Sequence, residues 1–162
     1  MAAIDSAEFE HFKKTFLYEE GAFFVDEVTR LDLDAKAMEA RFDTTRALPL
    51  SDLQRASPQH PAHMSGAELV MATGGLGLLH AWCFYGCRFD EGWAGFGNRI
   101  HRADFKRLVK RGPLLVMHSR ETRARVGARR IVLRFEFEFF QDEALVYQGD
   151  QSAMFVKGRP LG

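Results

Sequence analysis

The spacing of apolar and polar residues changes its period three times along the chain. Phe9, Phe12 and Phe16 recur at intervals of three and four, which predicts a short amphipathic helix over residues 5–16. We expect this helix to lie on the outside of the domain, within an N-terminal extension at residues 1–21. Alternation with a period of two then predicts two strands, joined by a tight polar turn, over residues 22–31 and 35–44.

A long helix is predicted over residues 65–84, after a proline-containing loop at residues 48–64. Ser65 and Glu68 have the spacing of a capping box at its start. The helix is apolar on every side, which predicts that a sheet encloses it. Three glycines, each costing about 1 kcal/mol relative to Ala, predict that another backbone approaches closely: Gly74, Gly75 and Gly77.

The rest of the chain alternates with a period of two, most clearly in LRFEFEFF. There Leu133, Phe135, Phe137 and Phe139 face one way and the charged residues the other. Four strands with short antiparallel connections are predicted over residues 95–106, 114–125, 129–140 and 144–157. Two strands, a buried helix and four strands form an α+β pattern. One curved antiparallel sheet wrapped around one helix satisfies it, as a single domain over residues 1–162.

Composition narrows the class of protein. The chain is 46% hydrophobic and 27% charged, as in globular proteins, and its 15 Phe suggest a wide apolar interior or tunnel. A formal charge of zero argues against nucleic-acid binding. However, acids dominate residues 1–54, whereas bases dominate residues 97–134. This asymmetry marks either two solvated faces or a basic rim for a phosphate-bearing or acidic partner.

Several classes of site and location are not expected. Cys83 and Cys87 alone build neither a disulfide framework nor a zinc site, and we expect reduced thiols, no metal and no cofactor. The N-terminus lacks a signal-peptide pattern, which favours a cytoplasmic protein. Glu68 and His80 would be costly inside a bilayer, so the long helix is interpreted as a core helix, with no membrane association.

Three stretches resemble the beta-hydroxyacyl-carrier-protein dehydratases, which have the hotdog fold. FFVDEVTRLD looks like their first strand, PQHPAHMSGAELV is similar to their loop and helix start, and IHRADFKRLVKRGPLL resembles a later strand and turn. The resemblance implies a hotdog dimer that acts on acyl thioesters of coenzyme A or of an acyl carrier protein. It also implies that the thioester carbonyl is polarised by the backbone amides of Gly66 and Ala67.

The two proton-carrying groups of that family are not matched. Aligning its Pro-x-His-Pro with Pro58, His60 and Pro61 places its catalytic histidine at Ala56, and aligning its helix-opening glycine with Gly66 places its carboxylate at Met71. The intervening loop is one residue longer than in the family, and a shift of one residue does not supply either group. An ordinary dehydration, which removes and returns protons, is therefore disfavoured as the reaction of this protein.

Two residues near the helix start are candidates for replacing these groups. His63 is either a general base or acid for a carbonyl held there, or a loop histidine that caps the helix. Glu68 either directs water for thioester hydrolysis or serves only in the capping box. Structural roles are expected for His60 and His80.

The resemblance also places four basic residues where they would contact the phosphates of coenzyme A or an acidic carrier protein: Lys106, Arg107, Lys110 and Arg111. The alternative interpretation is that these four residues only form a turn exposed to solvent. Asn98, Arg99 and His101 are expected beside the acyl tunnel, along the dimer interface. Three functions stay open: an enzyme of dehydratase descent with an altered active site, an acyl thioesterase, and a non-catalytic acyl-binding subunit.

Overall fold

The computed structural model describes residues 4–158. Its first helix, α1 (Ser6–Thr15), begins at Asp5, whose carboxylate accepts hydrogen bonds from the amides of Ala7 and Glu8. The predicted apolar face is buried, because Phe9 and Phe12 point into the core and the Phe12 ring packs edge-on against Trp82 at 5.4 Å. The short helix η1 (Glu20–Ala22) follows, and so the next strand starts later than residue 22.

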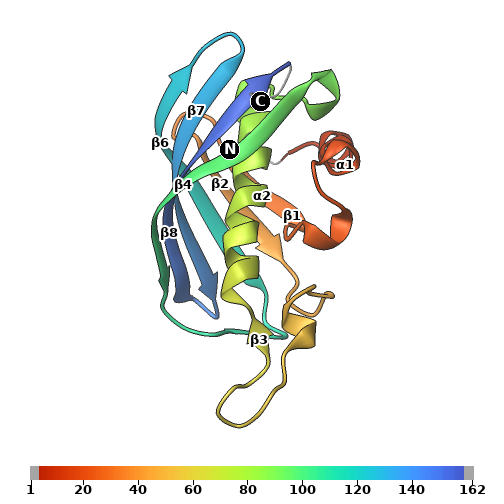
Figure 1. Cartoon of the computed structure of the whole chain (residues 1–162), viewed down its shortest axis with the longest axis vertical. Coiled ribbons are helices and arrows are strands. Elements are labelled where there is room, and N and C mark those ends of the chain that lie inside the picture. Colours follow the sequence, from red (N-terminus) through yellow and green to blue (C-terminus); the bar gives the residue numbers. More distant parts are fainter. Residues whose placement is uncertain (1–3, 159–162) are drawn as a thin grey trace.

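The strands form one antiparallel sheet in the order β1-β2-β6-β7-β8-β4. Their bounds are β1 Glu27–Asp32, β2 Ala37–Phe42, β4 Trp93–Phe105, β6 Leu115–Val126, β7 Arg130–Gln141 and β8 Ala144–Lys157. Alternate residues of β7 are buried, as predicted. The sheet curves around the long helix α2 (Gly66–Tyr85), and α1 lies on the side of α2 that the sheet leaves open (Figure 1). The predicted α+β architecture is confirmed.

The helix α2 begins with the predicted capping box at Ser65 and Glu68, and it ends at Gly86, whose φ of 63° is the left-handed conformation that glycine favours. Its length and composition suit a membrane span, but 67% of its most apolar window is buried inside the protein. The prediction of a close backbone is wrong. A Cβ at Gly75 would meet the Phe23 ring at 3.4 Å, one at Gly77 the Phe135 ring at 3.5 Å, and one at Gly74 nothing within 4 Å.

The loop before α2 is more ordered than its composition suggests. It contains the short helix η2 (Ser51–Leu53) and the strand β3 (His63–Met64). The strand β3 pairs with β5 (Val109–Lys110), which lies in the connection between β4 and β6. Another short helix, η3 (Phe89–Glu91), connects α2 to β4. The β3–β5 pair therefore joins two distant connections at the N-terminal end of α2.

Candidate functional site

The N-terminus of α2 presents unused hydrogen-bond donors. Ser65 caps the helix by accepting from the Glu68 amide, while the amides of Gly66 and Ala67 donate to no other group within residues 4–158. Ala67 is exposed and Gly66 is half-buried. Free N–H groups at the positive end of a helix dipole favour a carbonyl oxygen that gains negative charge. The family resemblance implies this chemistry for Gly66 and Ala67.

Two connections converge on this helix start. In the β3–β5 ladder, His63 lies opposite Lys110 and Met64 opposite Val109. Phe105, the last residue of β4, also contacts the helix, and a Cβ added to Gly66 would lie 3.0 Å from its ring. A larger residue at this position would require the Phe105 ring to shift. The segment from Phe105 to Lys110 is thus held beside Gly66.

The imidazole of His63 is oriented by one hydrogen bond. Its Nδ1 lies 2.7 Å from the carbonyl oxygen of Pro61, and its backbone amide donates to Gln54 Oε1 at 3.1 Å. A carbonyl oxygen only accepts, so Nδ1 carries the hydrogen. In the neutral ring, Nε2 then holds a free lone pair. His63 is half-buried and has the form of a general base.

Glu68 has a different environment. Its side chain is 2% exposed, and its Oε1 accepts from the amides of Leu50 at 2.8 Å and Ser51 at 3.1 Å. Its Oε2 accepts from the Ser51 hydroxyl and from the amide and hydroxyl of Ser65. Burial raises the pKa of Glu68, but these hydrogen bonds outweigh it, and the pKa lies below its ordinary value. Both oxygens are engaged in joining η2 to the start of α2.

The four predicted phosphate-binding residues divide into two kinds. Arg111 donates to Asp52 at 2.7 Å and to the Arg46 carbonyl at 2.8 Å, which ties it to the loop before α2. Lys106 lies 3.3 Å from Asp104. Arg107 and Lys110 are exposed and make no ion pair within the described chain. Arg107 and Lys110 are therefore the cations near His63 that remain open to an anion.

An apolar cavity of about 310 Å³ runs beside α2. Its lining includes Met71, Gly74, Phe96, Phe135 and Phe155, and it reaches the edge strand β4. Met71, at the position of the family carboxylate, is therefore a wall of this cavity, whereas Ala56 lies exposed in the loop. Neither position carries a group that moves protons.

One side of the cavity is polar. Gln151 lies 2.9 Å from the hydroxyl of Thr73 through Oε1, and its Nε2 donates to the Tyr147 hydroxyl at 3.0 Å. A Cβ at Gly149 would lie 2.7 Å from the Tyr147 hydroxyl, so the glycine makes room for this ring on β8. Sequence reasoning missed Gln151 and Tyr147. The alternation along β8 could have revealed them, because residues 147, 149, 151, 153 and 155 of this strand lie on one face of the sheet.

A second buried polar cluster lies at the other end of α2. His80 Nε2 lies 3.0 Å from Glu121, and the Tyr85 hydroxyl donates to the same carboxylate at 2.8 Å. Lys36 lies 3.8 Å from Glu121. Burial lowers the pKa of His80 despite Glu121, and its Nδ1 has no partner in the described residues. The expected satisfied core histidine is thus satisfied on one nitrogen only.

The two cysteines are free. Burial raises the pKa of the Cys83 thiol to about 12 and that of Cys87 to about 11. Because the thiolate is the reactive form, neither cysteine is a nucleophile at neutral pH. The described residues contain no group of His, Cys, Asp or Glu arranged to hold a metal ion.

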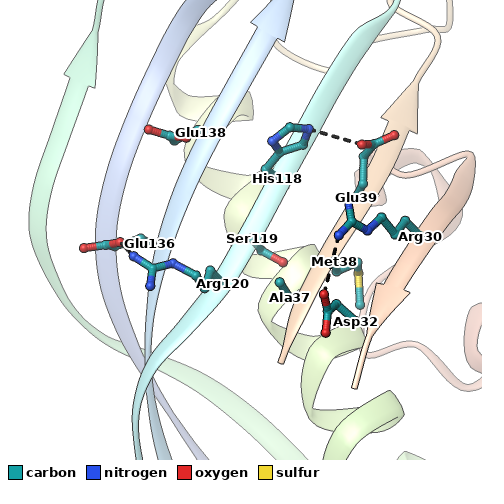
Figure 2. Close-up of a pocket in the computed structure, with 10 residues that line it drawn as sticks. All are labelled: Arg30, Asp32, Ala37, Met38, Glu39, His118, Ser119, Arg120, Glu136 and Glu138. Atoms are coloured by element: carbon teal, nitrogen blue, oxygen red, sulfur yellow. Dashed lines mark hydrogen bonds and ion pairs between the residues drawn. The ribbon is translucent and has the colours of Figure 1, made fainter. Parts of the chain in front are cut away.

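A further pocket, of about 290 Å³, lies on the sheet across β1, β2, β6 and β7 (Figure 2). Most of its charged side chains pair with one another: His118 lies 3.4 Å from Glu39, Arg30 lies 3.4 Å from Asp32, and Arg120 pairs with Glu136. Glu138 has no ion-pair partner within the described residues, so the carboxylates of this pocket outnumber its arginines, which disfavours an anion.

No protein-family model matches the chain, and no curated protein matches it. Several solved structures are similar to the chain. A mutant thioesterase from Pseudomonas aeruginosa has a TM-score of 0.53 and 14% identity, over 82% of this chain and 81% of that one. The dehydratase heterocomplex ApeI:P from Xenorhabdus doucetiae has a TM-score of 0.60 and 12% identity, over 88% and 87%. An HP0420 homologue from Helicobacter felis has a TM-score of 0.57 and 12% identity, over 100% and 96%.

These structural similarities show the fold, whereas identities of 12–14% leave the reaction to be argued from the site. The long helix within a six-stranded antiparallel sheet is the arrangement that the chain shares with these thioesterases and dehydratases. The chain is a hotdog-fold protein.

Proposed function

We propose that the protein binds an acyl thioester of coenzyme A or of an acyl carrier protein and hydrolyses it. The observation that carries this proposal is the combination at one end of α2. Two free amides, at Gly66 and Ala67, begin the helix three residues after His63, whose Nε2 lone pair is free in the neutral ring, and an apolar cavity lies further along the same helix.

Hydrolysis needs one positioned base and one site for the oxyanion. His63 Nε2 takes a proton from a water molecule as the water oxygen bonds to the thioester carbon. The negative charge that forms on the carbonyl oxygen is stabilised by the amides of Gly66 and Ala67. The C–S bond then breaks, and the thiolate receives the proton from the His63 imidazolium. Carboxylic acid and free thiol are the products.

The cavity and the basic segment suit the two ends of such a substrate. Phe96, Phe135 and Phe155 would surround an acyl chain, while the Gln151 amide would face a polar substituent on it. Arg107 and Lys110 would meet the phosphates of coenzyme A or an acidic carrier, with Lys106 and Arg111 behind them in their ion pairs.

We propose that the protein is a homodimer through β4. This strand is an edge of the sheet, and its unpaired backbone groups are flanked by exposed Phe96, Ile100 and Phe105. Antiparallel pairing of two copies of β4 would continue the sheet and cover these side chains. It would also close the cavity, which reaches β4. A cytoplasmic location is proposed on the two free thiols.

The second candidate function is that of a non-catalytic subunit. It is favoured by Ala56 and Met71, which replace the two proton-carrying residues of the dehydratase family. Dehydration needs proton carriers at both positions, and Glu68 is held by five hydrogen bonds away from that role. The similar dehydratase from Xenorhabdus doucetiae is a heterocomplex. A different hotdog chain paired with this one would supply the missing groups.

The test uses saturated, 3-hydroxy and trans-2-enoyl thioesters, following free thiol and enoyl absorbance. Hydrolysis predicts thiol release that falls about 100-fold or more in His63→Ala. His60→Ala is the matched control, since this exposed ring lies 5.0 Å from His63, and it should retain the rate. Reversible hydration without thiol release would replace the proposal with a dehydratase. Binding without either reaction would replace it with the acyl-binding subunit.

A further inference from the structure

A groove of about 320 Å³ lies on the face of the sheet away from α2, across β4, β6, β7 and β8. Four arginines surround it, and their strands run side by side in the sheet: Arg123, Arg125, Arg130 and Arg134. Asn98, His101 and Ser152 complete the polar lining, and no acidic side chain contributes to it.

The arginines of this groove are mostly uncompensated. Arg134 binds Asp150 with two hydrogen bonds, of 2.8 and 2.6 Å. Within residues 4–158, Arg123, Arg125 and Arg130 have no ion-pair partner. Arg123 also lies directly opposite Arg134 in the β6–β7 ladder. The Asp150 carboxylate thus offsets one of these two neighbouring guanidinium charges and leaves the other open to an anion.

The polar lining adds hydrogen-bond donors. The Ser152 hydroxyl donates to Asn98 Oδ1 at 2.7 Å, so its oxygen accepts from His101 Nε2 at 3.2 Å. Nε2 therefore carries the hydrogen in His101. The Asn98 side-chain amide keeps its N–H groups for a ligand.

We infer that this groove is a binding site for a compact phosphate-bearing anion, of the size of a diphosphate or a nucleotide phosphate group. Guanidinium groups match phosphate oxygens in paired hydrogen bonds, and the groove is small and concave rather than an extended basic surface. The pocket of Figure 2 is of similar size on the same sheet, but its carboxylates outnumber its arginines. Net charge therefore distinguishes the two.

The groove is separate from the proposed thioester site. Asn98 and Phe105 are seven residues apart on β4, which is about 20 Å of strand. Phe105 contacts the start of α2, whereas the groove faces the opposite side of the sheet. The groove and the start of α2 can therefore be altered separately by mutation.

Calorimetric titration with inorganic pyrophosphate tests the inference. We expect saturable binding at low ionic strength that weakens about tenfold or more in Arg125→Gln/Arg130→Gln, together with shifts of the Asn98 side-chain amide in NMR spectra. Arg41→Gln, an exposed arginine on β2 outside the groove, is the charge-matched control and should bind as the wild type does. Arg123→Gln should also weaken binding, because it removes a cation of the groove that has no ion-pair partner within the described residues.

Coenzyme A in place of pyrophosphate identifies the source of the phosphate. If coenzyme A no longer binds to Arg125→Gln/Arg130→Gln but still binds to Arg107→Gln/Lys110→Gln, the groove holds the nucleotide of coenzyme A. If the groove variant weakens the binding of pyrophosphate but not that of coenzyme A, the ligand of the groove is a free phosphate compound. The inference is overturned if pyrophosphate shows no saturable binding, or if the folded double variant binds it as tightly as Arg41→Gln does.

Discussion

Replacing Glu68 should test whether this carboxylate stabilises the fold or performs the reaction. Glu68→Ala removes the acceptor for three backbone amides and two hydroxyls at a side chain that is 2% exposed. A hydrogen bond to a charged group contributes about 1.5–3 kcal/mol, and the contributions do not add fully. We therefore expect a loss of about 3–5 kcal/mol in the free energy of unfolding.

Thermal and urea denaturation measure this loss. For a domain of this size, 1 kcal/mol corresponds to about 2–4 °C, which gives a decrease in Tm on the order of 10 °C. Glu68→Gln keeps one acceptor oxygen and should lose less, about 1–3 kcal/mol. Below Tm, thioester hydrolysis by the Gln variant should remain close to the wild-type rate.

The pH dependence gives a second readout. The pKa of Glu68 is lower in the folded protein than its ordinary value, so its stabilising contribution is present above the unfolded pKa and is lost as pH falls through the folded pKa. Glu68→Gln should therefore lose less stability than the wild type on acidification below about pH 4. An unchanged Tm combined with a hydrolysis rate reduced about 100-fold would refute the structural role and assign catalysis to Glu68.

Three further changes test the cavity, the buried cluster and the edge strand. Gly74→Leu, which points into open space beside α2, should raise stability by up to about 1 kcal/mol and shift activity toward shorter acyl chains, measured by kcat/KM across a chain-length series. Glu121→Ala removes the hydrogen-bond acceptor of the buried His80 and the half-buried Tyr85 and should cost about 1–3 kcal/mol in urea denaturation. Ile100→Asp on β4 should produce monomers in analytical ultracentrifugation; a persistent dimer would exclude β4 pairing.

The fold was predictable because local pattern and global burial agree. The buried alternation of β7 and the capping box of α2 both follow from neighbouring residues. The late start of β1 did not follow, because the apolar run Phe23, Phe24 and Val25 looks like a strand but is buried as an irregular segment between η1 and β1. The rings that fill the space over Gly75 and Gly77 come from Phe23 and Phe135, which no local pattern links to α2.

The candidate site was predictable only in part. Gly66, Ala67 and His63 lie together at the helix start, since they are close in sequence. The pairing of His63 with Lys110 depends on two-residue strands that exist only through contact with each other. Glu68 is held by Leu50 and Ser51, and this distant contact decides its environment. The excess of arginine was visible in the sequence, but the pairing of Arg134 with Asp150 was not.

The central claim is that a thioester carbonyl binds at the N-terminus of α2. Its most direct test is the backbone amide NMR spectrum during titration with a substrate analogue in which a methylene group replaces the thioester sulfur. The account predicts that the amides of Gly66 and Ala67 show the largest saturable shifts. Saturable binding of the analogue with both amides unmoved would contradict it.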